Sequence, residues 1–224
     1  MAFNFDHARE HLKSFNFSEL FIKDIGWDNP GHDLEISYND DLLYLEAVAQ
    51  KRGLGVYICS PQEDGQIPDS AGRRKIETEL RKQVHEHILI FTDQKNTRQV
   101  WQWVRREPGR PISSREHEYR YGQSGEPLLQ RLQKLVVTLE EEEKLGILDV
   151  TSRVRAAFDV EPVTRRFYDQ YNKEHTAFLQ FLEGIPEESM QRWYVSVTLN
   201  RLMFVYFIQK KLFLNKDEDY LRTK

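Results

Sequence analysis

Two patterns of hydrophobic and polar positions divide the chain into elements. Alternating or short continuous apolar runs, typical of strands, predict strands over 34–38, 42–49, 56–59, 87–93 and 99–104. Apolar residues spaced three and four apart, typical of helices, predict helices over 7–25, 71–87, 128–143, 151–158, 163–182 and 187–214. Residues 105–127 are rich in Arg, Pro, Gly and Ser and are predicted to form an irregular loop.

The order of these elements indicates the fold class. A helix, a hairpin, a strand, a helix and two further strands are followed by helices alone, which predicts an α+β protein. We expect a mixed α/β domain over 1–146 and an all-helical connector domain over 147–224. The last helix contains Asn200 and Arg201, and its apolar stretch is shorter than the roughly 20 residues that cross a bilayer. The sequence therefore predicts no membrane partner.

Composition narrows the class of protein only slightly. Of the 224 residues, 39% are hydrophobic and 30% are charged, as in ordinary globular proteins. Cys59 is the single cysteine, which excludes an internal disulfide and a cysteine-rich zinc site. Residues 1–7 are neither basic nor followed by an apolar run, so no secretory signal is predicted. We expect a cytoplasmic location.

Charge is unevenly distributed along the chain. The net charge is −4, yet residues 1–70 carry 5 Lys/Arg against 13 Asp/Glu, whereas residues 71–122 carry 12 against 7. A basic segment within an acidic protein is expected where one face meets phosphate. Ordinary solvation of exposed charge gives the same pattern, so both interpretations stay open.

The order helix, three strands, helix and strand resembles the core of the PD-(D/E)xK nucleases. That chemistry needs acids on two adjacent strands to hold Mg²⁺, and a lysine two residues after the second acid. Asp41 and Glu46, at the second strand, are the candidate metal ligands, and Asp69 joins them as a candidate catalytic residue. The third strand, 56–59, contains neither an acid nor a lysine. We therefore expect a degenerate nuclease core, with Mg²⁺ as cofactor only if the nuclease is active.

Two regions of the sequence carry a more specific resemblance. Residues 199–214 read LNRLMFVYFIQKKLFL and are followed by YLR at 220–222. Residues 101–111 read WQWVRREPGRP, and residues 115–125 read REHEYRYGQSG. Both regions resemble the N-terminal part of fused restriction–modification proteins of the type IIG kind and their relatives in phage defence. The core of those bacterial enzymes is an adenine-specific DNA methyltransferase that uses S-adenosylmethionine.

The resemblance implies a module that lies just upstream of a methyltransferase domain. It implies S-adenosylmethionine as cofactor of the full-length parent and no cofactor for this chain. Double-stranded DNA and the methyltransferase domain are the implied partners. The leading hypothesis is a noncatalytic DNA-contacting or scaffolding module. The alternatives are a Mg²⁺-dependent endonuclease domain of the same enzyme and a docking scaffold with no DNA contact.

The segment from 101 to 125 supplies the DNA-binding candidates. Basic and aromatic side chains in a loop suit phosphate contact and stacking on bases. The candidate DNA-contacting residues are Arg105, Arg106, Arg110, Arg115 and Arg120. In the alternative interpretation, these arginines pair with Glu107, Glu116 and Glu118, while Trp101 and Trp103 are buried together on one face of their strand.

Overall fold

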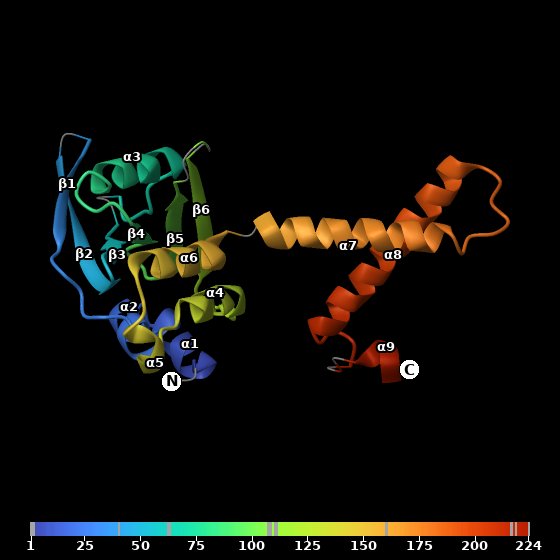
Figure 1. Ribbon diagram of the computed structural model, residues 1–224, viewed down its shortest axis with the longest axis horizontal. Helices are drawn as coiled ribbons and strands as arrows, with labels where there is room; N and C mark the ends of the chain where they lie inside the picture. The colour runs from blue at the N-terminus through green and yellow to red at the C-terminus, as the bar shows by residue number, and fades with distance from the viewer. Residues whose placement is uncertain are drawn as a thin grey trace. The chain divides into compact units, whose positions relative to one another are not determined.

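The computed structural model describes residues 3–39, 41–61, 64–106, 109, 112–159, 161–215, 217 and 219–223. The chain forms two compact units, 1–160 and 161–224 (Figure 1). The fold is mixed α+β, as the element order predicts. The division between the units falls later than the expected boundary at 146/147. The reason is that helix α6 (Ile147–Phe158) packs in the first unit, where Val150, Val154, Ala157 and Phe158 are buried.

A six-stranded sheet forms the centre of the first unit. Its strands lie side by side in chain order: β1 (Leu34–Tyr38), β2 (Asp41–Lys51), β3 (Leu54–Cys59), β4 (His87–Thr92), β5 (Arg98–Arg105) and β6 (Ser113–Arg120). β3 and β4 are parallel, and every other neighbouring pair is antiparallel. The parallel pair needs a crossover connection, which α3 (Ser70–Leu80) supplies.

Both faces of the central strands of this sheet, β3, β4 and β5, are buried. Along β4, Ile88 and Ile90 enter one core whereas Leu89 and Phe91 enter another, as the alternation of a strand requires. Figure 1 shows α3 over one face and the other helices of the unit on the opposite face. All of β4 is buried, so its continuous apolar run marks a strand that is covered on both sides.

The larger core lies between the sheet and a group of short helices. They are α1 (Phe5–Lys13), α2 (Phe17–Glu19), the π-helix η1 (Leu20–Asp24), α4 (Glu126–Leu132), the 3₁₀ turn η2 (Gln133–Leu135), α5 (Leu139–Glu142) and α6. Trp101 is fully buried here, and its ring centroid lies 5.5 Å from that of Phe17 and 6.0 Å from that of Phe21. Trp103 belongs to the same core, which confirms that the two tryptophans share one buried face of β5.

The polar groups of two side chains, Lys51 and Trp27, attach the end of β2 and the segment after η1 to the helices. The Lys51 ammonium group is buried, lies 2.8 Å from a carboxylate oxygen of Asp28 and forms a second ion pair with Glu142. The indole N–H of Trp27 donates a hydrogen bond of 3.0 Å to the carbonyl of Leu135. Buried polar groups are costly unless they are paired, so these bonds fix where the helices meet the sheet.

The second unit is helical. It contains α7 (Glu161–Leu179), α8 (Glu188–Lys210) and the short α9 (Tyr220–Thr223). His175 Nε2 on α7 lies 3.0 Å from Ser196 Oγ on α8. The backbone N–H of Leu221 donates to the Gln209 side-chain oxygen at 2.9 Å, which holds α9 to the end of α8. Among the helices described, none is long and apolar enough to cross a membrane.

Strand β6 corrects the prediction of an irregular loop over 105–127. The strand pairs with β5 along its whole length, from Arg98 opposite Arg120 to Arg105 opposite Ser113. Its residues are almost all polar, and the only fully buried one is Tyr119. The apolar alternation that reveals a strand is therefore missing from the sequence, although backbone pairing with β5 forms regardless of side-chain polarity.

Three predicted helices also differ in detail. The helix expected over 128–143 is divided into α4, η2 and α5 and is interrupted over 136–138. The helix expected over 7–25 is divided into α1, α2 and η1, and Phe15 has a φ of 58°, in the left-handed region that ends a helix. The helix expected over 71–87 ends at Leu80, which leaves His87 free to begin β4. Its N-cap is Asp69, whose carboxylate accepts the N–H of Gly72 at 2.7 Å.

The core position of Trp101 gives a stability prediction. We expect Trp101→Ala to lower the free energy of unfolding by about 3–5 kcal/mol, because it removes a fully buried ring and leaves a cavity. Leu42→Ala, at a side chain in the same sheet that is 74% exposed, should change it by less than about 0.5 kcal/mol. Urea unfolding followed by circular dichroism measures both, and equal losses would contradict the assignment of Trp101 to the core.

Candidate functional site

The predicted nuclease residues do not form a site. Asp41 begins β2, and Glu46 lies five residues further along the same strand. A strand advances about 3.3 Å per residue and alternates its faces, so the two side chains lie about 17 Å apart along β2 and on opposite faces. Asp69 is occupied as the cap of α3. These three residues therefore cannot share one Mg²⁺.

The neighbouring strand offers no replacement for the missing groups. β3 reads LGVYIC and contains neither an acid nor a lysine. Its last residue, Cys59, is fully buried, and desolvation raises the pKa of the thiol to about 12, so it is not a nucleophile at neutral pH. Asp41 does line an open recess of about 640 Å³ together with Asp64 and Tyr38. Within the described part of the chain, this recess holds no group of three potential metal ligands.

Of the described candidate DNA-contacting arginines, Arg105, Arg115 and Arg120 lie on β5 or β6, Arg106 directly follows β5, and all four pair with acids. Arg105 and Arg115 both pair with the buried carboxylate of Asp159, at 3.2 and 3.4 Å. Arg120 pairs with Glu118 at 2.7 Å. Arg110 lies outside the residues that the structure describes. The expectation of a loose basic loop is wrong for the described arginines, because strand pairing orders them and carboxylates neutralise them.

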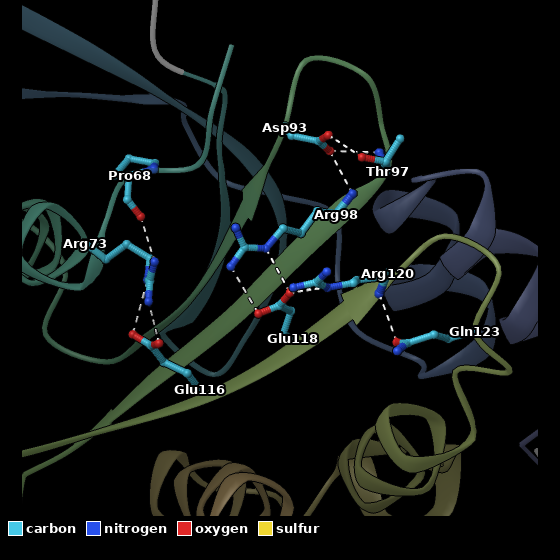
Figure 2. Close-up of polar contacts among 9 residues, drawn as sticks. All are labelled: Pro68, Arg73, Asp93, Thr97, Arg98, Glu116, Glu118, Arg120 and Gln123. Carbon is cyan, nitrogen blue, oxygen red and sulfur yellow. Dashed lines mark hydrogen bonds and ion pairs between the residues drawn. The ribbon is translucent and has the colours of Figure 1, made fainter. Parts of the chain in front are cut away.

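Figure 2 shows how acidic and basic side chains pair around β5, β6 and α3. The Glu118 carboxylate forms an ion pair with Arg98, at 2.9 Å from Arg98 Nε to Glu118 Oε1, in addition to its pair with Arg120. Glu116 receives two hydrogen bonds from Arg73, at 3.2 and 2.7 Å. The described arginines of β5 and β6 are therefore paired with acids, and Asp159, which Arg105 and Arg115 share, lies outside the segment 71–122.

Arg106 is the most deeply enclosed of the described candidates. Its side chain is 9% exposed, forms an ion pair with Glu77 of α3 and lies 4.0 Å from a carboxylate oxygen of Glu86. Its guanidinium also donates to the backbone carbonyl of His85 at 3.1 Å. Burial raises the pKa of Glu86 and lowers that of Arg106, because both charged forms lose solvent. The group has the character of a structural ion-pair cluster.

His87 stands beside this cluster and is neutral. Burial lowers its pKa to about 4, since a protonated imidazole would be desolvated there. Its Nδ1 lies 3.0 Å from the carbonyl oxygen of Val84, which fits an N–H donor at Nδ1. The neutral ring lies against the carboxylates without adding a positive charge to them.

A different kind of surface covers the second unit. On α8, Leu202 and Phe204 are 54% and 63% exposed. Two residues along a helix correspond to about 200° of rotation, so these side chains lie on nearly opposite sides and one neighbouring helix cannot cover both. Exposed large apolar side chains in this unit are Phe167, Tyr168, Phe181, Met190, Trp193, Tyr194, Leu202, Met203, Phe204, Tyr206, Phe207, Leu212, Phe213 and Leu221.

Part of this surface is hollowed. An open groove of about 530 Å³ is lined by Phe167 of α7 and by Leu202, Met203, Tyr206 and Phe207 of α8. At its C-terminal end, the Lys210 and Lys211 ammonium groups lie 5.9 and 5.7 Å from the ring centroids of Tyr206 and Phe207. A groove with apolar walls and a basic end suits a protein surface that offers apolar residues beside acids. We refer to these exposed side chains of α7 and α8 as the apolar helical surface.

Sequence reasoning overlooked a group at the other end of the chain, His7, His11 and Asp24. The signal was present, since two histidines four residues apart in a predicted helix share one face. The position of Asp24 could not be predicted, because it depends on the π-helix η1.

Comparison with known proteins gives no relative: no protein family, no curated protein and no solved structure matches the chain.

Arg106 provides a test of its structural role. We expect Arg106→Ala to lower the free energy of unfolding by about 3–5 kcal/mol, because it leaves Glu77 and Glu86 buried without their cation. Arg120→Ala should cost less than about 1 kcal/mol, since that side chain is 65% exposed. Urea unfolding of both variants measures the two losses in free energy of unfolding. A loss confined to Arg120→Ala would contradict the structural role assigned to Arg106.

The pKa of His87 gives a prediction for acid stability. Between pH 6.5 and about 4 the unfolded chain binds a proton at His87 that the folded protein does not, so stability falls as the pH is lowered through this window. The loss amounts to roughly 3 kcal/mol. In His87→Gln the slope of unfolding free energy against pH should decrease, whereas His32→Gln, at an exposed histidine, should keep it. Urea titrations from pH 7 to 4 measure the slope, and identical slopes in all three proteins would refute the prediction.

Proposed function

We propose that the chain is a noncatalytic docking module for the catalytic domain of an adenine-specific DNA methyltransferase of the restriction–modification kind. The apolar helical surface carries this proposal. A helix that is apolar on all sides belongs in a protein interior, and contiguous exposed apolar surface marks a site of interaction. In α8 only Val195 and Gln209 are buried, so the helix still has most of its apolar circumference to cover.

The sequence resemblance identifies the occupant. The residues of α8 that match the methyltransferase-associated signature include Leu202, Phe204, Tyr206 and Phe207, and all four are at least half exposed. In the enzymes that the chain resembles, this signature lies next to the methyltransferase domain. A signature made of exposed apolar side chains is what a docking surface for that domain requires.

The first unit supports a scaffolding role. Its three antiparallel strands, crossover helix and parallel fourth strand follow the order expected of a nuclease-like core. Its acids do not converge, and β3 has no lysine, so the proposal includes no cleavage step. The proposal also places no DNA contact on Arg105, Arg106 or Arg115, because each of them is held by carboxylates of the protein. DNA recognition and S-adenosylmethionine chemistry belong to the partner domain.

The test is coexpression with the methyltransferase domain encoded at the same locus. We expect a one-to-one complex by size exclusion with light scattering. Replacing two exposed aromatics in Phe204→Ser/Phe207→Ser should weaken its Kd by about thirtyfold or more, because truncating a central aromatic costs about 2 kcal/mol. Tyr121→Ser, at a tyrosine of the first unit that is 66% exposed, should leave the Kd unchanged.

Two results would count against this proposal. If the chain alone forms a dimer that the Phe204→Ser/Phe207→Ser variant abolishes, a second copy covers the surface. If the complex forms equally well with that variant, its contacts lie elsewhere. Both replaced side chains are more than half exposed, so the variant should remain folded, and circular dichroism checks this.

A further inference from the structure

His7, His11 and Asp24 converge in the first unit, far along the chain from the apolar helical surface. The two histidines lie one turn apart on α1, and their ring centroids are 4.4 Å apart. His7 Nδ1 lies 2.7 Å from one carboxylate oxygen of Asp24, and His11 Nδ1 lies 2.8 Å from the other. Among the described residues, this is the one set of three such ligands whose donor atoms lie within 4.8 Å of one another.

The burial of Asp24 is the first unusual feature. Its side chain is 3% exposed, while the side chains of His11 and His7 are 16% and 48% exposed. A buried carboxylate requires strong partners, and here both hydrogen-bond partners are imidazole nitrogens. The group therefore combines one buried carboxyl group with two imidazole nitrogens and is accessible to solvent at His7.

The backbone at Asp24 is the second unusual feature. Asp24 is the last residue of η1, a π-helical turn, and such turns occur frequently at functional sites. A π-helical turn rotates the following side chains relative to an α-helix. This local geometry directs Asp24 toward α1 while Leu20 and Phe21 of the same turn remain in the core.

We propose that His7, His11 and Asp24 bind a divalent transition metal ion, with Zn²⁺ the best match. Two imidazoles and one carboxylate are ligands that Zn²⁺ prefers, and it takes them in tetrahedral geometry with water as a fourth. Ligand bonds of about 2.0–2.1 Å place tetrahedral ligand atoms about 3.3 Å apart. The present separations of 2.7 and 2.8 Å, each to a different oxygen of Asp24, must therefore open by about half an ångström or more. The half-exposed His7 ring has room to move in this way.

Proton balance is simple in this binding step. Each imidazole whose Nδ1–H donates to Asp24 moves that proton to Nε2, and the freed Nδ1 lone pair binds the metal in place of the hydrogen bond. This change of tautomer keeps the proton on its ring. The ion then links α1 to η1, two elements that pack against Trp101, and acts as a structural clamp of the first unit.

Zinc titration of the metal-free full-length chain tests the site. After treatment with EDTA and buffer exchange, calorimetry should show one Zn²⁺ per chain. Zn²⁺ at about one hundred times its Kd should raise the Tm by roughly 5–10 °C. Co²⁺ should give the visible absorption of a tetrahedral site, which reports ligand geometry independently of stability.

Variants separate this site from adventitious binding. His7→Ala should weaken the Kd for Zn²⁺ by more than about tenfold and remove the Co²⁺ bands, since even the loss of an outer-shell partner costs about that much. Because the His7 side chain is half exposed, we expect this variant to remain folded, and circular dichroism checks this. The matched control His32→Ala removes an exposed histidine outside the site and should bind as the wild type does.

The outcomes are distinct from those of the docking test. Absence of Zn²⁺ binding by the folded wild-type chain, or binding that His7→Ala leaves unchanged, would overturn the proposal. Because the site and the apolar helical surface lie in different units, neither result changes the expectation for complex formation.

Discussion

The first unit depends on the burial of β4 on both of its faces. Ile88 and Ile90 on one face and Leu89 and Phe91 on the other join two separate cores, so the sheet must be covered on both sides at this strand. Parallel pairing with β3 requires a crossover, and that crossover is α3, which covers one face. The helices from both ends of the unit then cover the opposite face around Trp101. The arrangement of helices on both sides of the sheet, and the crossover between β3 and β4, therefore follow from the burial of β4 on both faces.

The packing of α3 on the sheet also determines how charged side chains pair in the first unit. Once α3 and the strands are packed, Arg106 has little access to water, and its position is tolerable because Glu77 and Glu86 are beside it. Arg105 and Arg115 share Asp159 in a similar way. The basic balance of residues 71–122 is a correct statement about the sequence. It does not place a free basic site at Arg105 and Arg115, because their compensating acid, Asp159, comes from elsewhere in the chain.

Much of the fold was predictable from the sequence, and the failures have physical reasons. The strands at β4 and β5, the hairpin of β1 and β2 and the long helices of the second unit all follow from apolar periodicity. β6 was not predictable, because its pairing uses backbone atoms while its side chains are polar.

The prediction of a nuclease site failed because Asp41 and Glu46 are separated by an odd number of positions on one strand, which places their side chains on opposite faces. The group around Asp24 depends on one π-helical turn, and no residue pattern in the sequence predicts that turn. The apolar character of α8 was predicted, but its exposure was not. Apolar periodicity indicates that a helix face should be buried, and it does not show whether another part of the same chain covers that face.

The polarity of β6 has a further consequence, for how this protein can assemble. β6 is the last strand of the sheet, so one row of its backbone groups is open to another strand. Such edges tend to recruit strands from neighbouring molecules unless charge discourages it. Arg115, Glu116, Glu118 and Arg120 place charges of both signs along this edge, and an incoming apolar strand would have to desolvate them. Growth of the sheet into an aggregate is thereby opposed at this side, and association is directed toward helix packing.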